Sequence, residues 1–209
     1  MFESARARFL ILIFAHFTAD FYGGLLTTLP DPTLKSHLGR SLVDVMYLMS
    51  LFSVVVNAIQ PITGLLLPKR GVPSLLLRGP LMASAMCCIG FTHSYAGLGA
   101  LLVLSGLGIG LLHPEAVLAA QGIIGARQGM GISLFLSGGY FGYSFGNWLG
   151  AEWASRWGLT NFWTMGGLVV VTLLLVRASG LHRLHGRASM EPPVAERHGI
   201  GFPAVFALG

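Results

Sequence analysis

Apolar residues gather along the chain in runs of about 20, separated by short segments that carry charges, prolines and glycines. A membrane-crossing α-helix needs about 20 mostly apolar residues. The pattern therefore predicts six transmembrane helices, over residues 8–29, 45–67, 74–92, 95–119, 129–151 and 159–176. The breaks between them, such as Pro30-Asp31-Pro32 and Pro68-Lys69-Arg70-Gly71, hold the turn residues and charges that end helices.

The composition also indicates an all-α integral membrane protein. Of the 209 residues, 54% are hydrophobic and 10% are charged, and the mean hydropathy is +0.71. Soluble domains have about 25% charged residues, and the runs are too long for barrel strands. The net charge of +5 does not indicate nucleic-acid binding, because the basic residues are not gathered in one polar domain. Cys87 and Cys88 are adjacent in an apolar run, which favours packing over a disulfide or a metal site.

The distribution of Lys and Arg predicts the orientation. With the N-terminus in the cytoplasm, only Lys35, Arg40 and Arg156 of the 13 basic residues fall in outer segments. The chain is therefore expected to be an inner (plasma) membrane protein, and the positive-inside rule predicts that both of its termini lie in the cytoplasm. The first run is too long for the apolar core of a signal peptide, and it contains His16 and Asp20.

The predicted helices form one domain over residues 1–178. Residues 179–209 are expected to be a cytoplasmic loop followed by the start of a truncated seventh helix. The first and fourth helices each carry a histidine and a carboxylate, which suggests a 3+3 internal repeat. Inverted repeats of this kind are common in secondary transporters, whose binding sites lie between them near the middle of the membrane.

His16 and Asp20 are the first candidate site residues. They are four apart, so they share one face of the first helix and can touch, well inside the apolar run. One interpretation is a pair that couples to protons or contacts substrate, because His and Asp exchange protons at water-accessible membrane sites. The alternative is a pair that satisfies itself and holds the helix in place.

His113-Pro114-Glu115 in the fourth helix is the second candidate. Pro114 has no N–H group, so its helix is expected to bend there and to turn His113 and Glu115 towards one cavity. At the cytoplasmic end of its helix, Glu115 is a possible partner for Arg127, or for Lys69 and Arg70. That arrangement is consistent with either a structural ion pair or a role with substrate or protons.

Smaller signals come from the second and fifth helices. Gln60 lines a cavity or bonds a neighbouring helix, and Tyr140, Tyr143 and Asn147 form one helical stripe that either lines a cavity or packs. Glycines at every fourth position allow two helix backbones to approach closely; they are Gly138, Gly142, Gly146 and Gly150.

Taken together, the motifs resemble a known family. The stretches GLGIGLLHPEAVLAA and GARQGMGISLFLSGGYFGYSFG resemble the fourth and fifth helices of major facilitator superfamily transporters of the fosmidomycin-resistance type. His16-x-x-x-Asp20 and Gln60-Pro61-x-x-Gly64 match as well, and the resemblance covers about residues 8–178. It implies a secondary, proton-driven transporter of small organic solutes, often a drug exporter, with six helices forming half of a twelve-helix protein.

The chain departs from this pattern in two places. The expected cytoplasmic latch between the second and third helices includes Gly64, Lys69, Arg70 and Gly71, with Arg127 nearby, but Pro68 stands where such transporters carry Asp. The six C-terminal helices are also missing, which leaves three alternatives: a truncated reading frame, a half that pairs with a second six-helix chain, or a homodimer.

The resemblance also defines the expected partners. They are a small-molecule solute, protons and the lipid bilayer, with no nucleic acid, cofactor or metal. An enzyme is not expected, because the chain has no nucleophile–base motif and no His-Glu-x-x-His metal motif. The rival interpretation is a non-transporting membrane subunit or an inert truncated half-transporter.

Overall fold

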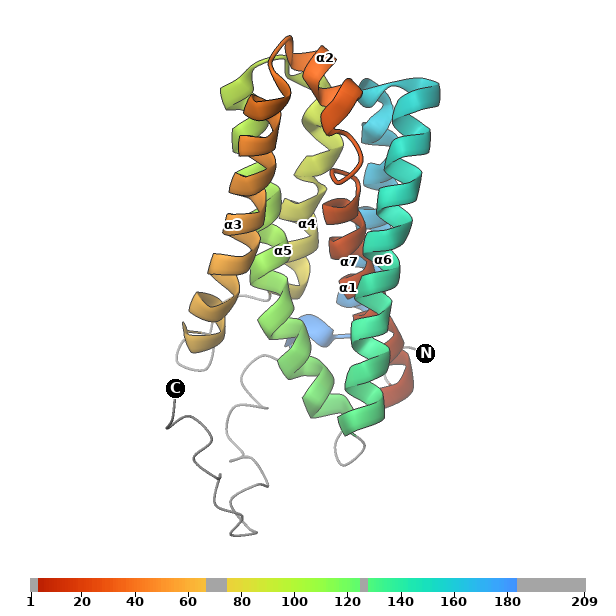
Figure 1. Ribbon diagram of the computed structural model, residues 1–209. Coiled ribbons are helices and arrows are strands. Elements are labelled where there is room, and N and C mark those ends of the chain that lie inside the picture. Colours follow the sequence, from red (N-terminus) through yellow and green to blue (C-terminus); the bar gives the residue numbers. More distant parts are fainter. Residues whose placement is uncertain (1–3, 67–74, 125–127, 184–209) are drawn as a thin grey trace, which may run out of the picture.

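The computed structural model describes residues 4–66, 75–124 and 128–183, and within these ranges it contains helices and no strands. The long elements run roughly alongside one another as a bundle (Figure 1). They are α1 (Ala5–Gly24), α3 (Leu42–Leu66), α4 (Leu75–Ala83), α5 (Tyr95–Ile124), α6 (Gln128–Trp157) and α7 (Gly166–Ala178). Short elements join or extend them: η1 (Pro30–Leu34), α2 (Lys35–Leu38), η3 (Ser84–Phe91), η5 (Leu159–Met165) and η6 (Leu181–Arg183).

Three described segments are long and apolar enough to cross a membrane: Leu42–Leu65, Tyr95–Ile124 and Leu159–Ala178. An apolar, all-helical membrane bundle is thus confirmed, while the count of six transmembrane helices and the 3+3 repeat stay predictions. The fifth helix is longer than the predicted 129–151, because α6 continues to Trp157. It ends just before Gly158, whose positive φ of 77° glycine adopts at no steric cost because it has no Cβ.

The helices predicted over 74–92 and 159–176 are each built from two kinds of helix. The first consists of α4 followed by the 3₁₀ segment η3, and the second of the 3₁₀ segment η5 followed by α7. The two 3₁₀ segments pack together where Gly90 lies directly on the backbone of Leu159 and Thr160. Hydropathy alone does not distinguish a 3₁₀ from an α conformation, so the sequence could not predict this change.

Helix α1 forms the core of the bundle and contacts α4, α5, α6 and α7. Leu12, Ala15, Ala19 and Tyr22 on α1 are fully buried. By contrast, α3 and α6 expose many large apolar side chains, as expected for surfaces that meet lipid or another helix. In Figure 1, α3 and α6 border the face towards the viewer, with α5 and α1 between them.

Glycines bring α6 close to α1 along most of its length. A Cβ at Gly142, Gly146 or Gly150 would collide with the backbone of Phe17, Phe21 or Leu25. Gly138 faces Ile13, where a Cβ would meet the Ile13 side chain instead of the backbone. Because the contacts advance by four residues on both helices, α1 and α6 run parallel with their backbones nearly touching.

Tyr22 joins α1 to the first turn of α7. Its buried hydroxyl donates to the carbonyl of Met165 (3.0 Å) and accepts from the backbone N–H of Val169 (3.1 Å). This N–H and the Met165 carbonyl lie one helical turn apart at the start of α7. The hydroxyl therefore satisfies two backbone groups where water is excluded.

Replacing Tyr22 with phenylalanine is expected to lower the free energy of unfolding by about 1–3 kcal/mol, because the two buried hydrogen bonds of the Tyr22 hydroxyl, to Met165 and Val169, are lost. Thermal unfolding of the purified protein in detergent measures the change. Tyr140→Phe is the matched control, since Tyr140 is 72% exposed. Equal melting temperatures for the two variants would contradict a buried bridging role for the Tyr22 hydroxyl.

Candidate functional site

The carboxylate of Asp20 lies between two imidazoles. Its Oδ2 atom is 3.2 Å from Nε2 of His16, one turn earlier on α1. Its Oδ1 atom is 3.2 Å from Nε2 of His113 on α5. The two rings meet edge to face, with centroids 4.9 Å apart. These three residues are called the His–Asp–His cluster below.

The outer nitrogen of each imidazole faces a backbone carbonyl. Nδ1 of His16 is 3.1 Å from the oxygen of Phe135, and Nδ1 of His113 is 2.7 Å from that of Ile109. A carbonyl only accepts hydrogen bonds, so each Nδ1 must carry a hydrogen to make its bond. The Phe135 ring also stacks on His16 at a centroid distance of 4.2 Å, which fixes that imidazole further.

Counting hydrogens shows what the cluster can do chemically. Its four contacts each join a ring nitrogen to an oxygen, so each needs one hydrogen to be a hydrogen bond. Four hydrogens on the cluster satisfy all four contacts. With three, one nitrogen lone pair faces an oxygen lone pair. The geometry of the cluster is therefore linked to the number of protons it holds.

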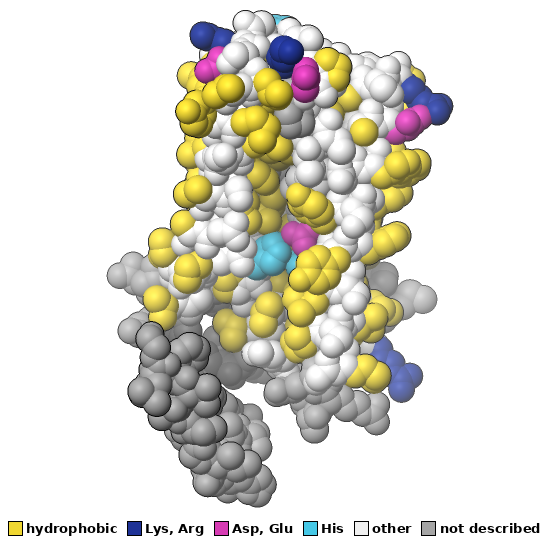
Figure 2. Space-filling model, in the orientation of Figure 1, with side chains coloured by type: hydrophobic (Ala, Val, Ile, Leu, Met, Phe, Trp, Pro, Cys, Tyr) yellow, Lys and Arg dark blue, Asp and Glu magenta, His cyan; other side chains and the backbone are white. Residues whose placement is uncertain are grey.

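The cluster is only partly buried. The side chain of His16 is 3% exposed, but those of Asp20 and His113 are 16% and 21% exposed. Figure 2 shows histidine and acidic side chains together within the bundle face that α3 and α6 border, surrounded by apolar groups. Two members of the cluster therefore reach the surface of the bundle, while the third is held inside the protein.

Gly139 on α6 makes room for the cluster. A Cβ at this position would lie 2.5 Å from Asp20 Oδ2 and 2.6 Å from His16 Nε2. Any side chain here would displace the His–Asp pair. The glycine stripe on α6 can be seen in the sequence, but the place of Gly139 at the site cannot, because only the packing of α6 on α1 brings it there.

His113 and Glu115 contact different helices, contrary to the expectation that they face one cavity. Helix α5 continues as one α-helix through Pro114, so residues two apart point in different directions. The buried Glu115 carboxylate accepts a hydrogen bond from Leu75 N–H at the start of α4. A carboxylate is favourable there because the N-terminus of a helix carries partial positive charge.

The other predicted site residues lie apart from the cluster. Tyr143 OH is 2.7 Å from Thr27 Oγ1, and Tyr140 is 72% exposed. The backbone oxygen of Asn147 accepts from Thr28 Oγ1 (3.2 Å), and its buried Oδ1 has no partner among the described residues. Gln60 is half-buried on α3, where Gly64 faces Pro114. Lys69, Arg70, Gly71 and Arg127 lie outside the described residues.

The cluster also has a donor set that a metal ion can use. Its two imidazole nitrogens and one carboxylate oxygen lie within 4.8 Å of one another, and no other such group occurs in the part of the chain that the structure describes. In the structure these atoms contact each other directly. We therefore interpret the cluster as a hydrogen-bonded group, and the absence of a metal cofactor stays a prediction.

Comparison with known proteins gives the family of the chain. The family model described as Major Facilitator Superfamily matches residues 9–202. The chain belongs to this superfamily. A relative within it, the fosmidomycin resistance protein of Escherichia coli (strain K12), is 25% identical over 166 residues, or 78% of this chain. The chain spans 41% of the length of that relative.

Proposed function

We propose that this chain moves a small organic solute across the membrane and that the His–Asp–His cluster couples this movement to protons. The observation that carries the proposal is the position of Asp20, between two imidazoles and partly exposed on a face of a membrane bundle. Ionisable groups at such depth are costly and usually mark a substrate or proton pathway. Membership of a transporter superfamily supports the same function.

The coupling of protonation to helix contacts follows from which helices carry the three residues of the cluster. Asp20 and His16 are on α1 and His113 is on α5, so the Asp20–His113 contact joins two helices. Loss of one proton removes one of the four hydrogen bonds of the cluster. Two of the four join helices: Asp20–His113 joins α1 to α5, and His16–Phe135 joins α1 to α6. A solute that binds next to Asp20 therefore favours one protonation state over another. Glu115 is a second, deeper carboxylate in this proposal, near the start of α4.

The proposed orientation is supported by the charges of the described residues. One end of the bundle carries Arg6, Arg8, Arg78, Arg177 and Arg183. The opposite end carries basic and acidic groups together, including the ion pair Lys35–Asp31 at 3.5 Å and the pair Arg156–Glu152. By the positive-inside rule, the arginine-rich end faces the cytoplasm, and both termini lie on the cytoplasmic side of a plasma membrane.

The proposal also needs a second helical unit. Alternating access requires two units that rock about a shared site, and the cluster opens on the face that α3 and α6 border. A second six-helix half, or another copy of this chain, would cover this face, bury its exposed apolar residues and close the site on one side at a time.

Flux into proteoliposomes tests the proposal. Fosmidomycin is the first solute to try, because the relative is named for resistance to it. The wild-type chain, reconstituted by itself or together with a second six-helix half, is expected to move it faster with a pH gradient than without. His113→Gln should lower the gradient-driven rate about tenfold or more, the effect of losing a charge-assisted hydrogen bond of about 1.5–3 kcal/mol.

His93→Gln is the matched control, since His93 is exposed and contacts the backbone of His37 away from the cluster. Its rate should stay near that of the wild type. Equal rates with and without the gradient would mean that the chain transports the solute without coupling to protons. If neither fosmidomycin nor any solute in a wider screen moved, with or without a second six-helix half, the chain would be the non-transporting membrane subunit instead.

A further inference from the structure

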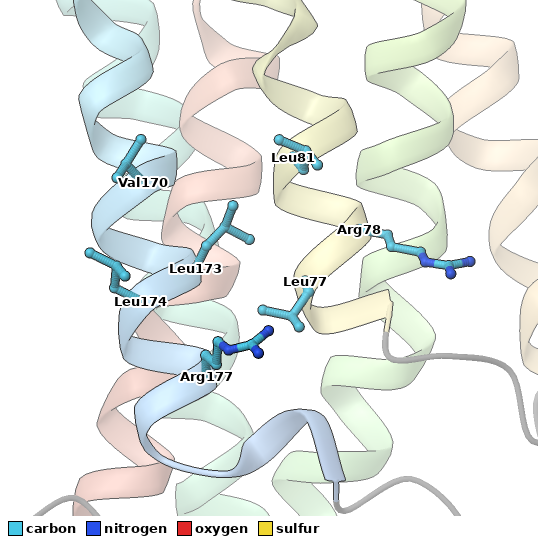
Figure 3. A pocket seen from close by; sticks show the side chains of 7 residues that line it. All are labelled: Leu77, Arg78, Leu81, Val170, Leu173, Leu174 and Arg177. Carbon is cyan, nitrogen blue, oxygen red and sulfur yellow. The ribbon is translucent and has the colours of Figure 1, made fainter.

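An apolar groove runs between α4 and α7 on the outer surface of the bundle, away from the His–Asp–His cluster. Its volume is about 340 Å³. Figure 3 shows it with Leu77 and Leu81 on the α4 side and Leu173, Leu174 and Val170 on the α7 side. In a membrane, such a surface groove lies among lipid acyl chains.

The groove has positive charge at one end only. Arg177 belongs to the last turn of α7, and Figure 3 shows its side chain reaching across towards Leu77 on α4. Arg78 also borders the groove, but its side chain extends away from α7. Both are exposed, and within the described residues neither forms an ion pair with a carboxylate. At the opposite end of the bundle, Lys35 and Arg156 do have carboxylate partners.

We infer that the α4–α7 groove binds an anionic phospholipid, with an acyl chain along the leucines and the phosphate on Arg177. The guanidinium of Arg makes two parallel hydrogen bonds to a phosphate, which Lys cannot match. The five apolar side chains give an acyl chain a surface that a free phosphate ion would not use. Arg78 adds attraction for a negatively charged headgroup without touching the same phosphate.

The surrounding arginines favour a headgroup with net negative charge over a zwitterionic one. Arg8 lies close by, because its Nε donates to the carbonyl of Ser179 (3.1 Å), two residues beyond Arg177. Arg183 follows on η6, which contacts both α4 and α7. Clusters of basic residues between membrane helices at the cytoplasmic side are typical of sites for anionic lipids. This inference does not depend on the proposed transport activity.

Lipid binding to the purified full chain in detergent tests the site. Native mass spectrometry during titration with phosphatidylglycerol or phosphatidylcholine gives an apparent affinity for each lipid. The wild type is expected to prefer phosphatidylglycerol. Arg177→Gln should reduce that preference about fivefold, the factor expected for one basic residue at an anionic surface, and Arg78→Gln should reduce it less.

Two control variants test the charge and the apolar groove separately. Arg156→Gln removes an exposed arginine at the other end of the bundle and should leave the preference unchanged. Leu81→Trp fills the groove from an exposed position and should weaken binding of both lipids while the arginines remain. An unchanged preference in Arg177→Gln, or displacement of the lipid by inorganic phosphate at equal concentration, would overturn the inference. So would equal binding of the two lipids to the wild type.

Discussion

Replacing Asp20 with asparagine is expected to abolish gradient-driven solute accumulation while the bundle stays folded. Asparagine has the shape of aspartate and can still bond both imidazoles, accepting from one and donating to the other. It cannot release a proton or balance the charge of an imidazolium, so the cluster no longer changes state with pH. The measurement is solute flux into proteoliposomes across a range of external pH, where the variant should show a flat, low profile.

The matched control is Asp44→Asn. Asp44 is at the start of α3, where its carboxylate accepts from the backbone N–H and hydroxyl of Ser41, far from the cluster. This variant should keep the pH profile of the wild type. If Asp20→Asn also kept the wild-type profile, the His–Asp–His cluster would not be the coupling site, and Glu115 would become the next carboxylate to test.

How far the sequence predicts the site depends on whether a contact is local. His16 and Asp20 are four residues apart, so helical geometry alone indicates that they touch. Asp20 and His113 are on different helices and far apart in the chain, and no spacing rule joins them. The sequence therefore suggests Glu115 as the companion of His113, whereas the structure brings His113 to Asp20. The carbonyl of Phe135, which holds His16, is on α6 and gives no sequence signal, whereas that of Ile109 lies only one turn before His113 on α5.

The fold also has features that the sequence predicts and features that depend on contacts between distant segments. Long apolar runs predict helices because a bilayer leaves the backbone few other ways to satisfy its hydrogen bonds. They do not reveal that η3 and η5 are 3₁₀ segments, since that depends on how Gly90 meets Leu159. The glycine stripe predicts a close helix contact, but its partner, α1, is known only from the packing.

Replacing Gly146 with alanine is expected to separate α1 from α6. The new Cβ would lie 2.9 Å from the carbonyl carbon of Phe21 and 3.0 Å from its Cα, closer than real Cβ atoms come. Backbone atoms cannot rotate away as a side chain can, so one helix must shift. Overpacking of this kind costs about 1–3 kcal/mol, which corresponds to a melting temperature lower by about 2–12 °C for a chain of this size.

Gly167→Ala is the matched control, because a Cβ there would have no neighbour within 4 Å. Alanine favours helix over glycine, so this variant should melt at or slightly above the wild-type temperature. The opposite signs distinguish close packing from a general effect of removing glycine. Equal melting temperatures for the two variants would mean that α1 and α6 are not in backbone contact.

Gly146→Ala should also disturb the His–Asp–His cluster. Gly139, which makes room for Asp20 and His16, is two turns from Gly146 on the same side of α6. A shift of α6 would also move the carbonyl of Phe135 away from His16 Nδ1, at 3.1 Å in the structure. Gly146→Ala should therefore lose gradient-driven flux even below its melting temperature, whereas Gly167→Ala keeps it. A stable Gly146→Ala protein with full flux would separate the packing of α6 from the chemistry of the cluster.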